Sequence, residues 1–163
     1  MDFNKISRYI NYKLIAWIIA FEVIGVLIGL STKPGIDPWY TNLNKSSLTP
    51  PGYIFSIVWP LLYLSLAIFG YIIYNTNNVI TRSRITNLYW IQMLLNWSWS
   101  YIFFNLKMTF TALLILIAIL GINAFVIIYL IRSMNRSCYI LLPYFVWICF
   151  AGYLNVIIVV LNN

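Results

Sequence analysis

The side chains in this chain that can take part in chemistry are mainly aromatic rings and amides. Among 163 residues there are 7 Trp, 13 Tyr and 10 Phe, but no His and only 3 Asp and Glu together. The commonest general base and the commonest metal ligand are therefore missing. The spacing of Cys138 and Cys149 is typical of neither a disulfide framework nor a zinc site. These residues predict binding by stacking and hydrogen bonding, without a metal site.

Aromatic residues and amides recur at helical spacing in three stretches. The stretches contain Gln92, Asn96, Trp99 and Phe103; Tyr144, Trp147, Ala151 and Asn155; and Phe55, Trp59, Leu62 and Leu66, with Tyr63 alongside. Residues three, four, seven and eleven positions apart share one face of a helix. Each stretch is therefore predicted to carry its rings and amides on one side.

These faces are predicted to point into the protein, because an amide in hydrocarbon costs several kcal/mol unless it is hydrogen-bonded. One interpretation is that the amides join helices to one another. The other is a pocket for a flat aromatic ligand, in which rings stack on the ligand and amides hold its polar edge. The faces alone leave both interpretations open.

Glu22 is the one acidic residue inside an apolar run. Acids at membrane depth are candidates for functional residues, and the alternative is a hydrogen-bonded packing role. Gly25 and Gly29 follow in the same run, with the spacing of close contacts between membrane helices. The contact could lie within the chain or between two copies of it.

Five long apolar segments of the sequence carry most of these residues and would position them. They cover approximately residues 14–30, 53–74, 85–104, 108–131 and 138–161. About 20 residues span a bilayer, and a backbone without water must bond within its own segment. The predicted fold is an all-α membrane protein, a five-transmembrane-helix bundle forming a single domain over residues 1–163. The connection over residues 32–52 is rich in Pro and Gly and is interpreted as a lid, with a plain linker as the alternative.

Composition and charge agree with a membrane protein. The chain is 63% hydrophobic and 8% charged, with a mean hydropathy of +0.87, which excludes an ordinary soluble enzyme and a disordered chain. A net charge of +7 would suggest nucleic acid in a soluble protein, but here no nucleic-acid partner is expected. Seven cations fall on the side of the N-terminus and three on the other: Lys5, Arg8, Lys13, Arg82, Arg84, Arg132 and Arg136, against Lys33, Lys45 and Lys107. The positive-inside rule therefore predicts a cytoplasmic N-terminus and an external C-terminus.

Three motifs between Trp39 and Asn155 resemble those of the TspO/MBR family, the tryptophan-rich sensory proteins related to the mitochondrial translocator protein. Each motif alone is weak, but the three occur in order and at the family's spacing. They are Trp39-Tyr40, Leu43, Lys45, Thr49-Pro50-Pro51-Gly52, Phe55, Val58-Trp59 and Leu62-Tyr63; Gln92, Leu95-Asn96, Trp99 and Phe103-Phe104; and Pro143-Tyr144, Trp147, Phe150-Ala151 and Leu154-Asn155.

The resemblance implies five transmembrane helices in a bacterial cell membrane, usually paired in a homodimer, with a ligand cavity near the long first connection. It also implies binding of porphyrins such as protoporphyrin IX and of hydrophobic drug-like molecules. The sterol-binding members carry a Tyr and a basic residue after the last Leu-Asn, and residues 156–163 contain neither. Carried over by motif, the ligand-binding residues are Trp39, Tyr40, Lys45, Phe55, Trp59, Tyr63, Gln92, Asn96, Trp99, Phe103, Tyr144, Trp147, Ala151 and Asn155.

The resulting hypothesis is an integral membrane protein that binds tetrapyrroles and other hydrophobic ligands between its helices. It would act in porphyrin handling, transport or stress signalling. No cofactor is required, since the porphyrin is ligand or substrate, and membrane lipids are the other expected partners. Two alternatives stay open. One is an enzyme that degrades protoporphyrin with light and oxygen through Trp59 and Trp147, and the other is a transporter of lipids or small molecules.

Overall fold

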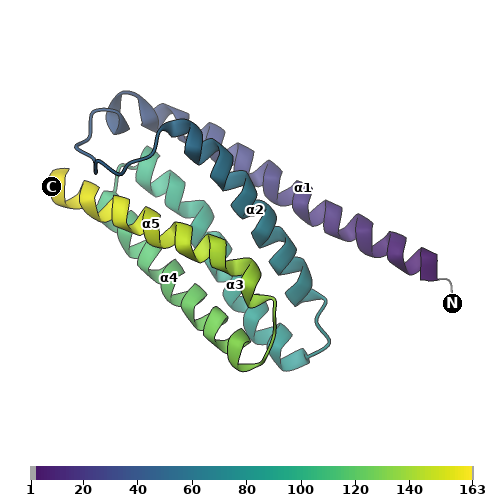
Figure 1. Cartoon of the computed structure of the whole chain (residues 1–163). Helices are drawn as coiled ribbons and strands as arrows, with labels where there is room; N and C mark the ends of the chain where they lie inside the picture. Colours follow the sequence, from purple (N-terminus) through teal and green to yellow (C-terminus); the bar gives the residue numbers. More distant parts are fainter. Residues whose placement is uncertain (1–2, 163) are drawn as a thin grey trace.

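Five long helices make up the protein (Figure 1). The computed structural model describes residues 3–162, with side chains from Tyr12 onward except that of Thr81. Residues 1, 2 and 163, and the side chains of Lys5 and Arg8 counted above, lie outside the described part. Residues 3–162 contain no strand, so the prediction of an all-α chain is confirmed. The elements are α1 (Phe3–Gly35), η1 (Ile36–Tyr40), α2 (Gly52–Tyr74), α3 (Val79–Ser100), η2 (Tyr101–Asn105), α4 (Thr109–Arg132) and α5 (Cys138–Asn162), with η1 and η2 as π-helical turns.

The helix boundaries agree with the predicted runs for α2, α4 and α5 and differ for α1 and α3. α1 extends beyond the predicted 14–30 in both directions, because polar residues can continue a helix. Pro34 lies inside its last turn, and the backbone first departs from helical geometry at Asp37 in η1. The predicted 85–104 helix begins earlier, at Val79, and its last turn is the π-helical η2. The connection predicted over residues 32–52 is correspondingly shorter, since α1 and η1 take up its first part and irregular chain covers residues 41–51.

Four helical segments of the described chain are long and apolar enough to cross a membrane: Tyr12–Tyr40, Gly52–Tyr74, Thr109–Arg132 and Cys138–Asn162. α3 is not among them, because its 22 residues include two arginines and several amides. The described chain therefore has the helices of a multi-pass integral membrane protein.

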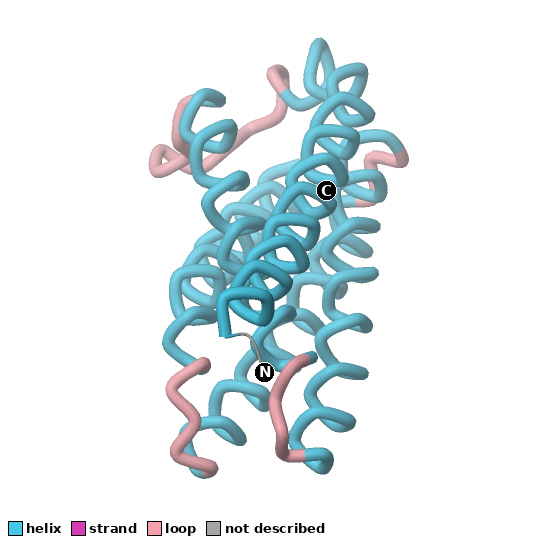
Figure 2. The backbone as a smooth tube through the Cα atoms, turned by 90° about the vertical axis from the view of Figure 1, so that its right-hand side faces the viewer, coloured by secondary structure: helices cyan, strands magenta, loops and turns pink. Residues whose placement is uncertain are grey.

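The helices run side by side, with their connections at the two ends of the bundle (Figure 2). Residues 41–51, the α3–α4 connection and the C-terminus lie at one end, and the α2–α3 and α4–α5 connections at the other (Figure 1). α1 packs against α2 and η2, α2 also against α5, and α4 against both α3 and α5. The helices therefore enclose a common interior.

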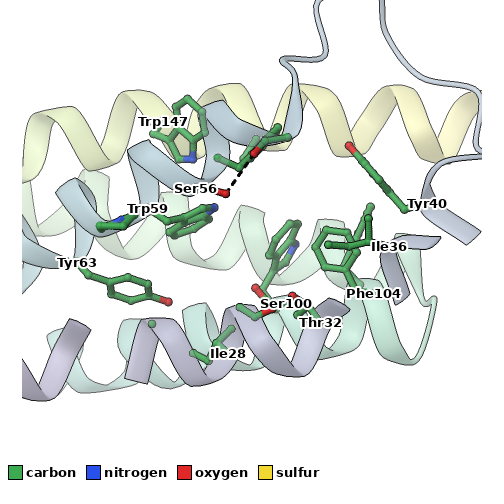
Figure 3. Close-up of a pocket in the computed structure, with 18 of the residues that line it drawn as sticks. Ile28, Thr32, Ile36, Tyr40, Ser56, Trp59, Tyr63, Ser100, Phe104 and Trp147 are labelled. Atoms are coloured by element: carbon green, nitrogen blue, oxygen red, sulfur yellow. Dashed lines mark hydrogen bonds between the residues drawn. The ribbon is translucent and has the colours of Figure 1, made fainter. Parts of the chain in front are cut away.

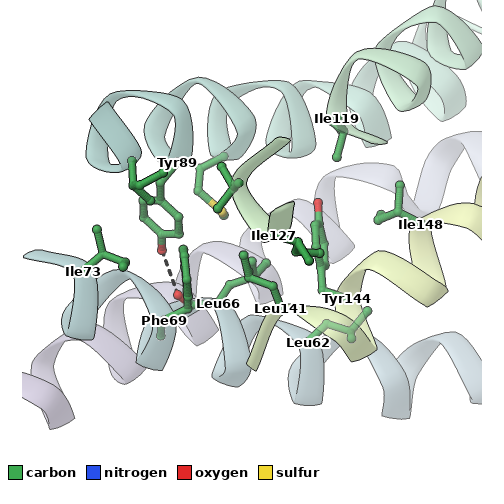
Figure 4. Packing of buried hydrophobic residues seen from close by; sticks show 14 of the residues in the cluster. Leu62, Leu66, Phe69, Ile73, Tyr89, Ile119, Ile127, Leu141, Tyr144 and Ile148 are labelled. Atoms are coloured by element: carbon green, nitrogen blue, oxygen red, sulfur yellow. Dashed lines mark hydrogen bonds between the residues drawn. The ribbon is translucent and has the colours of Figure 1, made fainter. Parts of the chain in front are cut away.

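The half of this interior farther from residues 41–51 is a close-packed core (Figure 4). Leu66 and Phe69 of α2 lie there with Leu141 and Ile148 of α5, all at most 1% exposed. In the same core the Tyr89 hydroxyl of α3 donates a hydrogen bond to the Leu66 carbonyl at 3.0 Å. This core fixes α2, α3, α4 and α5 relative to one another and leaves the opposite half of the interior for a site.

Aromatic rings attach α1 to this core. Trp17 stacks on Phe21, with ring centroids 5.8 Å apart, and both rings contact Tyr89 and Trp90 of α3. Elsewhere α1 is more open, and its exposed residues include Ile15, Ile19, Val23, Val26, Leu27 and Leu30. An apolar surface of this kind suits contact with lipid tails.

We expect Gly70→Ala to destabilise the protein. A Cβ at Gly70 would lie 2.5 Å from the Tyr89 hydroxyl and 2.7 Å from Trp17 Cζ3, so packed rings would have to move. The expected loss in free energy of unfolding is about 1–3 kcal/mol, measured by denaturant titration in detergent.

Gly121→Ala in α4 is the matched control, since no atom lies within 4 Å of a Cβ there. The higher helix propensity of alanine should leave this variant unchanged or more stable by up to about 1 kcal/mol. Equal stability of the two variants would show that α1, α2 and α3 do not meet at Gly70.

Candidate functional site

A cavity of about 470 Å³ occupies the half of the interior nearest residues 41–51. Its walls come from α1 and η1, from α2, from the α3–η2 junction and from α5. Figure 3 shows Trp147 and Trp59 facing the same space, with Tyr63 toward one end and Tyr40 toward the other. The Tyr63 end is here called the inner end, and the Tyr40 end the mouth.

The structure brings most of the predicted binding residues together on this cavity. The three aromatic faces of the sequence lie on α2, α3–η2 and α5, and all three turn toward the same interior space. The predicted residues that line the cavity are Tyr40, Phe55, Trp59, Tyr63, Trp99, Phe103, Trp147, Ala151 and Asn155.

The aromatic walls are held by contacts among the rings. The ring of Phe55 on α2 packs edge to face against Trp147 of α5, with the ring centroids 5.7 Å apart. The ring centroids of Trp59 and Tyr63 are 5.8 Å apart. Trp99 stacks on Phe103 at 5.1 Å. Since each ring is positioned by a neighbour, the cavity offers flat apolar surfaces that need little rearrangement to accept a planar ligand.

Three of the predicted residues, Gln92, Asn96 and Tyr144, do not line the cavity but lie in the core at its inner end. The Tyr63 hydroxyl donates to Asn96 Oδ1 at 3.2 Å, and Asn96 Nδ2 donates to the Tyr144 hydroxyl at 2.8 Å. Asn96 of α3 thus joins α2 to α5. The interpretation that amides join helices is thus confirmed for Asn96, whereas the shallower rings line the cavity.

Trp39 and Lys45 are also outside the lining. Trp39 packs edge to face on Phe103 at 5.6 Å, behind the cavity wall. Lys45 Nζ donates to the carbonyls of Tyr40, Thr41 and Leu43 at 2.8–2.9 Å. An ammonium group has three donors, so these bonds occupy all of them. Lys45 therefore folds the start of the connection onto itself and does not direct its charge into the cavity.

The connection over residues 41–51 is fastened to the end of α5. Asn162 accepts a hydrogen bond from the Asn44 amide and donates one to the Asn44 carbonyl, each at 2.9 Å. The hydroxyls of Ser46 and Tyr153 are 3.0 Å apart. These contacts hold the connection across the end of the bundle where the cavity lies.

From α1 the sequence singled out Glu22 and a close helix contact at Gly25 and Gly29, but it did not place this helix in the wall of a cavity. Glu22, Gly25 and Gly29 all line the cavity, together with Val26, Ile28, Thr32 and Ile36. A Cβ at Gly25 would lie 2.7 Å from the Tyr63 ring, so the close contact that this glycine allows is with α2 of the same chain. Gly29 instead faces open space. The small residues flanking Glu22 were the available signal, because they mark where a helix can approach a neighbouring wall.

We expect Asn96→Leu to lower the free energy of unfolding by about 1–3 kcal/mol, because two buried tyrosine hydroxyls lose their partner. Asn123→Leu in α4 is the matched control. Asn123 is equally buried, but it donates only to the Ile119 carbonyl of its own helix, and its Oδ1 has no partner among the described residues. Its replacement should be neutral or stabilising in denaturant titration. An equal change in the free energy of unfolding for Asn96→Leu and Asn123→Leu would contradict the role of Asn96 as a bridge between α2 and α5.

Similarity to known proteins extends over almost the whole chain. The family model described as TspO/MBR family matches residues 17–161. The chain is 35% identical over 150 residues to the tryptophan-rich protein TspO of Archaeoglobus fulgidus, covering 92% of this chain and 97% of that protein. It is 30% identical over 143 residues to the protein of the same name from Bacillus cereus, covering 85% and 90%. With the human translocator protein the identity is 29% over 119 residues, covering 72% and 70%. The chain is thus a membrane protein that belongs to the TspO/MBR family, as its three motifs predicted.

Proposed function

We propose that this protein binds flat tetrapyrroles, with protoporphyrin IX as the first candidate, in the cavity between α1, α2, α3–η2 and α5. Through that binding it acts in porphyrin handling, transport or stress signalling. The observation that carries the proposal is the convergence of Trp59, Trp99 and Trp147 from three helices on one cavity. Its volume of about 470 Å³ lies within the range of roughly 300–1,000 Å³ typical of small-molecule sites.

The charges around the cavity favour one orientation of the ligand. A protoporphyrin is a flat apolar ring that carries two propionates on one edge. Glu22 is the one charged side chain among the described residues lining the cavity, and the Lys45 ammonium is already bonded to backbone carbonyls. Propionates at the inner end would meet the Glu22 carboxylate, so the ring enters with its propionates at the mouth, where water can solvate them.

The proposal includes five membrane crossings with a cytoplasmic N-terminus. α3 has 22 residues, which at about 1.5 Å each covers roughly the 30 Å of a bilayer core. The bond from Asn96 to Tyr144 satisfies one of its amides inside the bundle. Arg82 and Arg84 lie in the first turns of α3, Arg132 ends α4, and Arg136 lies in the α4–α5 connection. All four therefore belong to the end of the bundle where Figure 1 places the α2–α3 and α4–α5 connections, as the positive-inside rule requires of a cytoplasmic side.

Titration of the purified protein with protoporphyrin IX tests this function. The titration is done in the dark in nonionic detergent, so that light-driven chemistry on the ring does not contribute, and it follows tryptophan fluorescence. We expect saturable quenching. Trp59→Ala and Trp147→Ala should each weaken binding about 10-fold, since each removes a stacking wall.

Trp90→Ala is the control for loss of a tryptophan outside the cavity, because Trp90 lies on the part of α3 that packs against α1. It should change the affinity less than about twofold. Linear quenching that none of the substitutions alters would mean that the porphyrin only partitions into micelles, and it would contradict the proposed function.

A further inference from the structure

We propose that Glu22 makes the inner end of the cavity a site for an organic cation, a ligand that carries a protonated amine on a flat aromatic body. The inference rests on the proposed function in one respect, namely that the cavity admits a flat aromatic ligand. It adds a preference for positive charge at a defined place in the cavity.

Glu22 lies at the level of Tyr63. Both residues line the cavity, and the Glu22 carboxylate is close enough to act electrostatically on the Tyr63 side chain. Gly25, about one turn farther along α1, is the position where a Cβ would contact the Tyr63 ring. The acid therefore belongs to the inner end of the cavity, the end of Tyr63, which lies opposite Tyr40 at the mouth in Figure 3.

Among the described residues, the Glu22 carboxylate has no partner of opposite charge. Within the described part of the chain no hydrogen bond or ion pair holds it, and the described lining of the cavity contains neither Lys nor Arg. The Tyr63 hydroxyl donates its hydrogen bond to Asn96 Oδ1 and not to Glu22. An unpaired carboxylate at membrane depth is costly, and a cation placed beside it removes that cost.

The rings near the inner end of the cavity also favour a cation. Trp59 and Tyr63 lie 5.8 Å apart on the same wall of the cavity. The faces of Trp and Tyr rings attract ammonium groups within about 6 Å, most strongly where water is excluded. A neutral aromatic ligand gains only the contact with the rings, whereas a protonated amine gains the rings and the carboxylate together. An anion at this end would be repelled by Glu22.

A matched pair of ligands tests the inference. 1-Pyrenemethylamine is protonated at neutral pH, and 1-pyrenemethanol has the same ring system without the charge. Binding is followed by energy transfer from tryptophan to pyrene in nonionic detergent. We expect the wild-type protein to bind the amine at least about 10-fold more tightly than the alcohol. Glu22→Gln should bring this ratio close to one and leave the affinity for the alcohol within about twofold, which also shows that the variant is folded.

Asp37→Asn is the control for losing a negative charge elsewhere. Asp37 lies in η1, where its carboxylate accepts a hydrogen bond from the Thr41 hydroxyl, and it does not line the cavity. This variant should keep the preference for the amine. An unchanged preference in Glu22→Gln would overturn the assignment to Glu22.

The affinities of the wild-type protein for the two probes also test the cation site, and this test does not depend on the stability of the variants. Equal affinities for amine and alcohol would overturn the cation site while leaving a cavity for flat aromatic ligands intact. Saturable binding of neither probe would overturn the inference together with the assumption that the cavity admits such ligands.

Discussion

The arrangement of the helices depends on one hydrogen-bonded bridge, in which Asn96 of α3 joins Tyr63 of α2 to Tyr144 of α5. In a bilayer no water is available to replace these partners, so the three helices must keep the spacing that the bridge sets. The bridge also lies where packed core gives way to cavity. On one side are close-packed apolar residues, and on the other are the aromatic walls, one of which includes Tyr63 itself.

The cavity is bounded differently at its two ends. The inner end is rigid, because Tyr63 is held by Asn96 and packs against Gly25 of α1. At the end of the bundle where the mouth lies, the connection over residues 41–51 is fastened through Lys45 to its own backbone and through Asn44 to Asn162 of α5. Connections of this kind, held by a few exposed hydrogen bonds, belong to the less stable parts of a protein. We therefore expect movement that opens the cavity to occur at the mouth rather than at the inner end.

Much of this architecture could be predicted from the sequence because the bilayer imposes a simple rule on it. The runs that became α2, α4 and α5 are continuous and apolar, so their lengths fixed their boundaries closely. Trp59 and Trp147 could be placed on inward faces because polar and aromatic groups recur at helical spacing. The α1 wall could not be predicted in this way, because the spacing of Gly25 and Gly29 indicated a close contact between helices but not that the contact borders a cavity. The role of Lys45 was also beyond the sequence, because its partners are backbone carbonyls of a non-repetitive segment.

One cavity, walled by aromatic residues from several helices, is the proposed ligand-binding site of this protein. The most direct measurement is the position of a bound porphyrin in crystals, located by anomalous scattering from a gallium-substituted protoporphyrin. We expect a single peak between Trp59 and Trp147, with the propionates toward Tyr40 and away from Glu22. A peak on the outer apolar surface of α1, with the cavity unfilled, would contradict it.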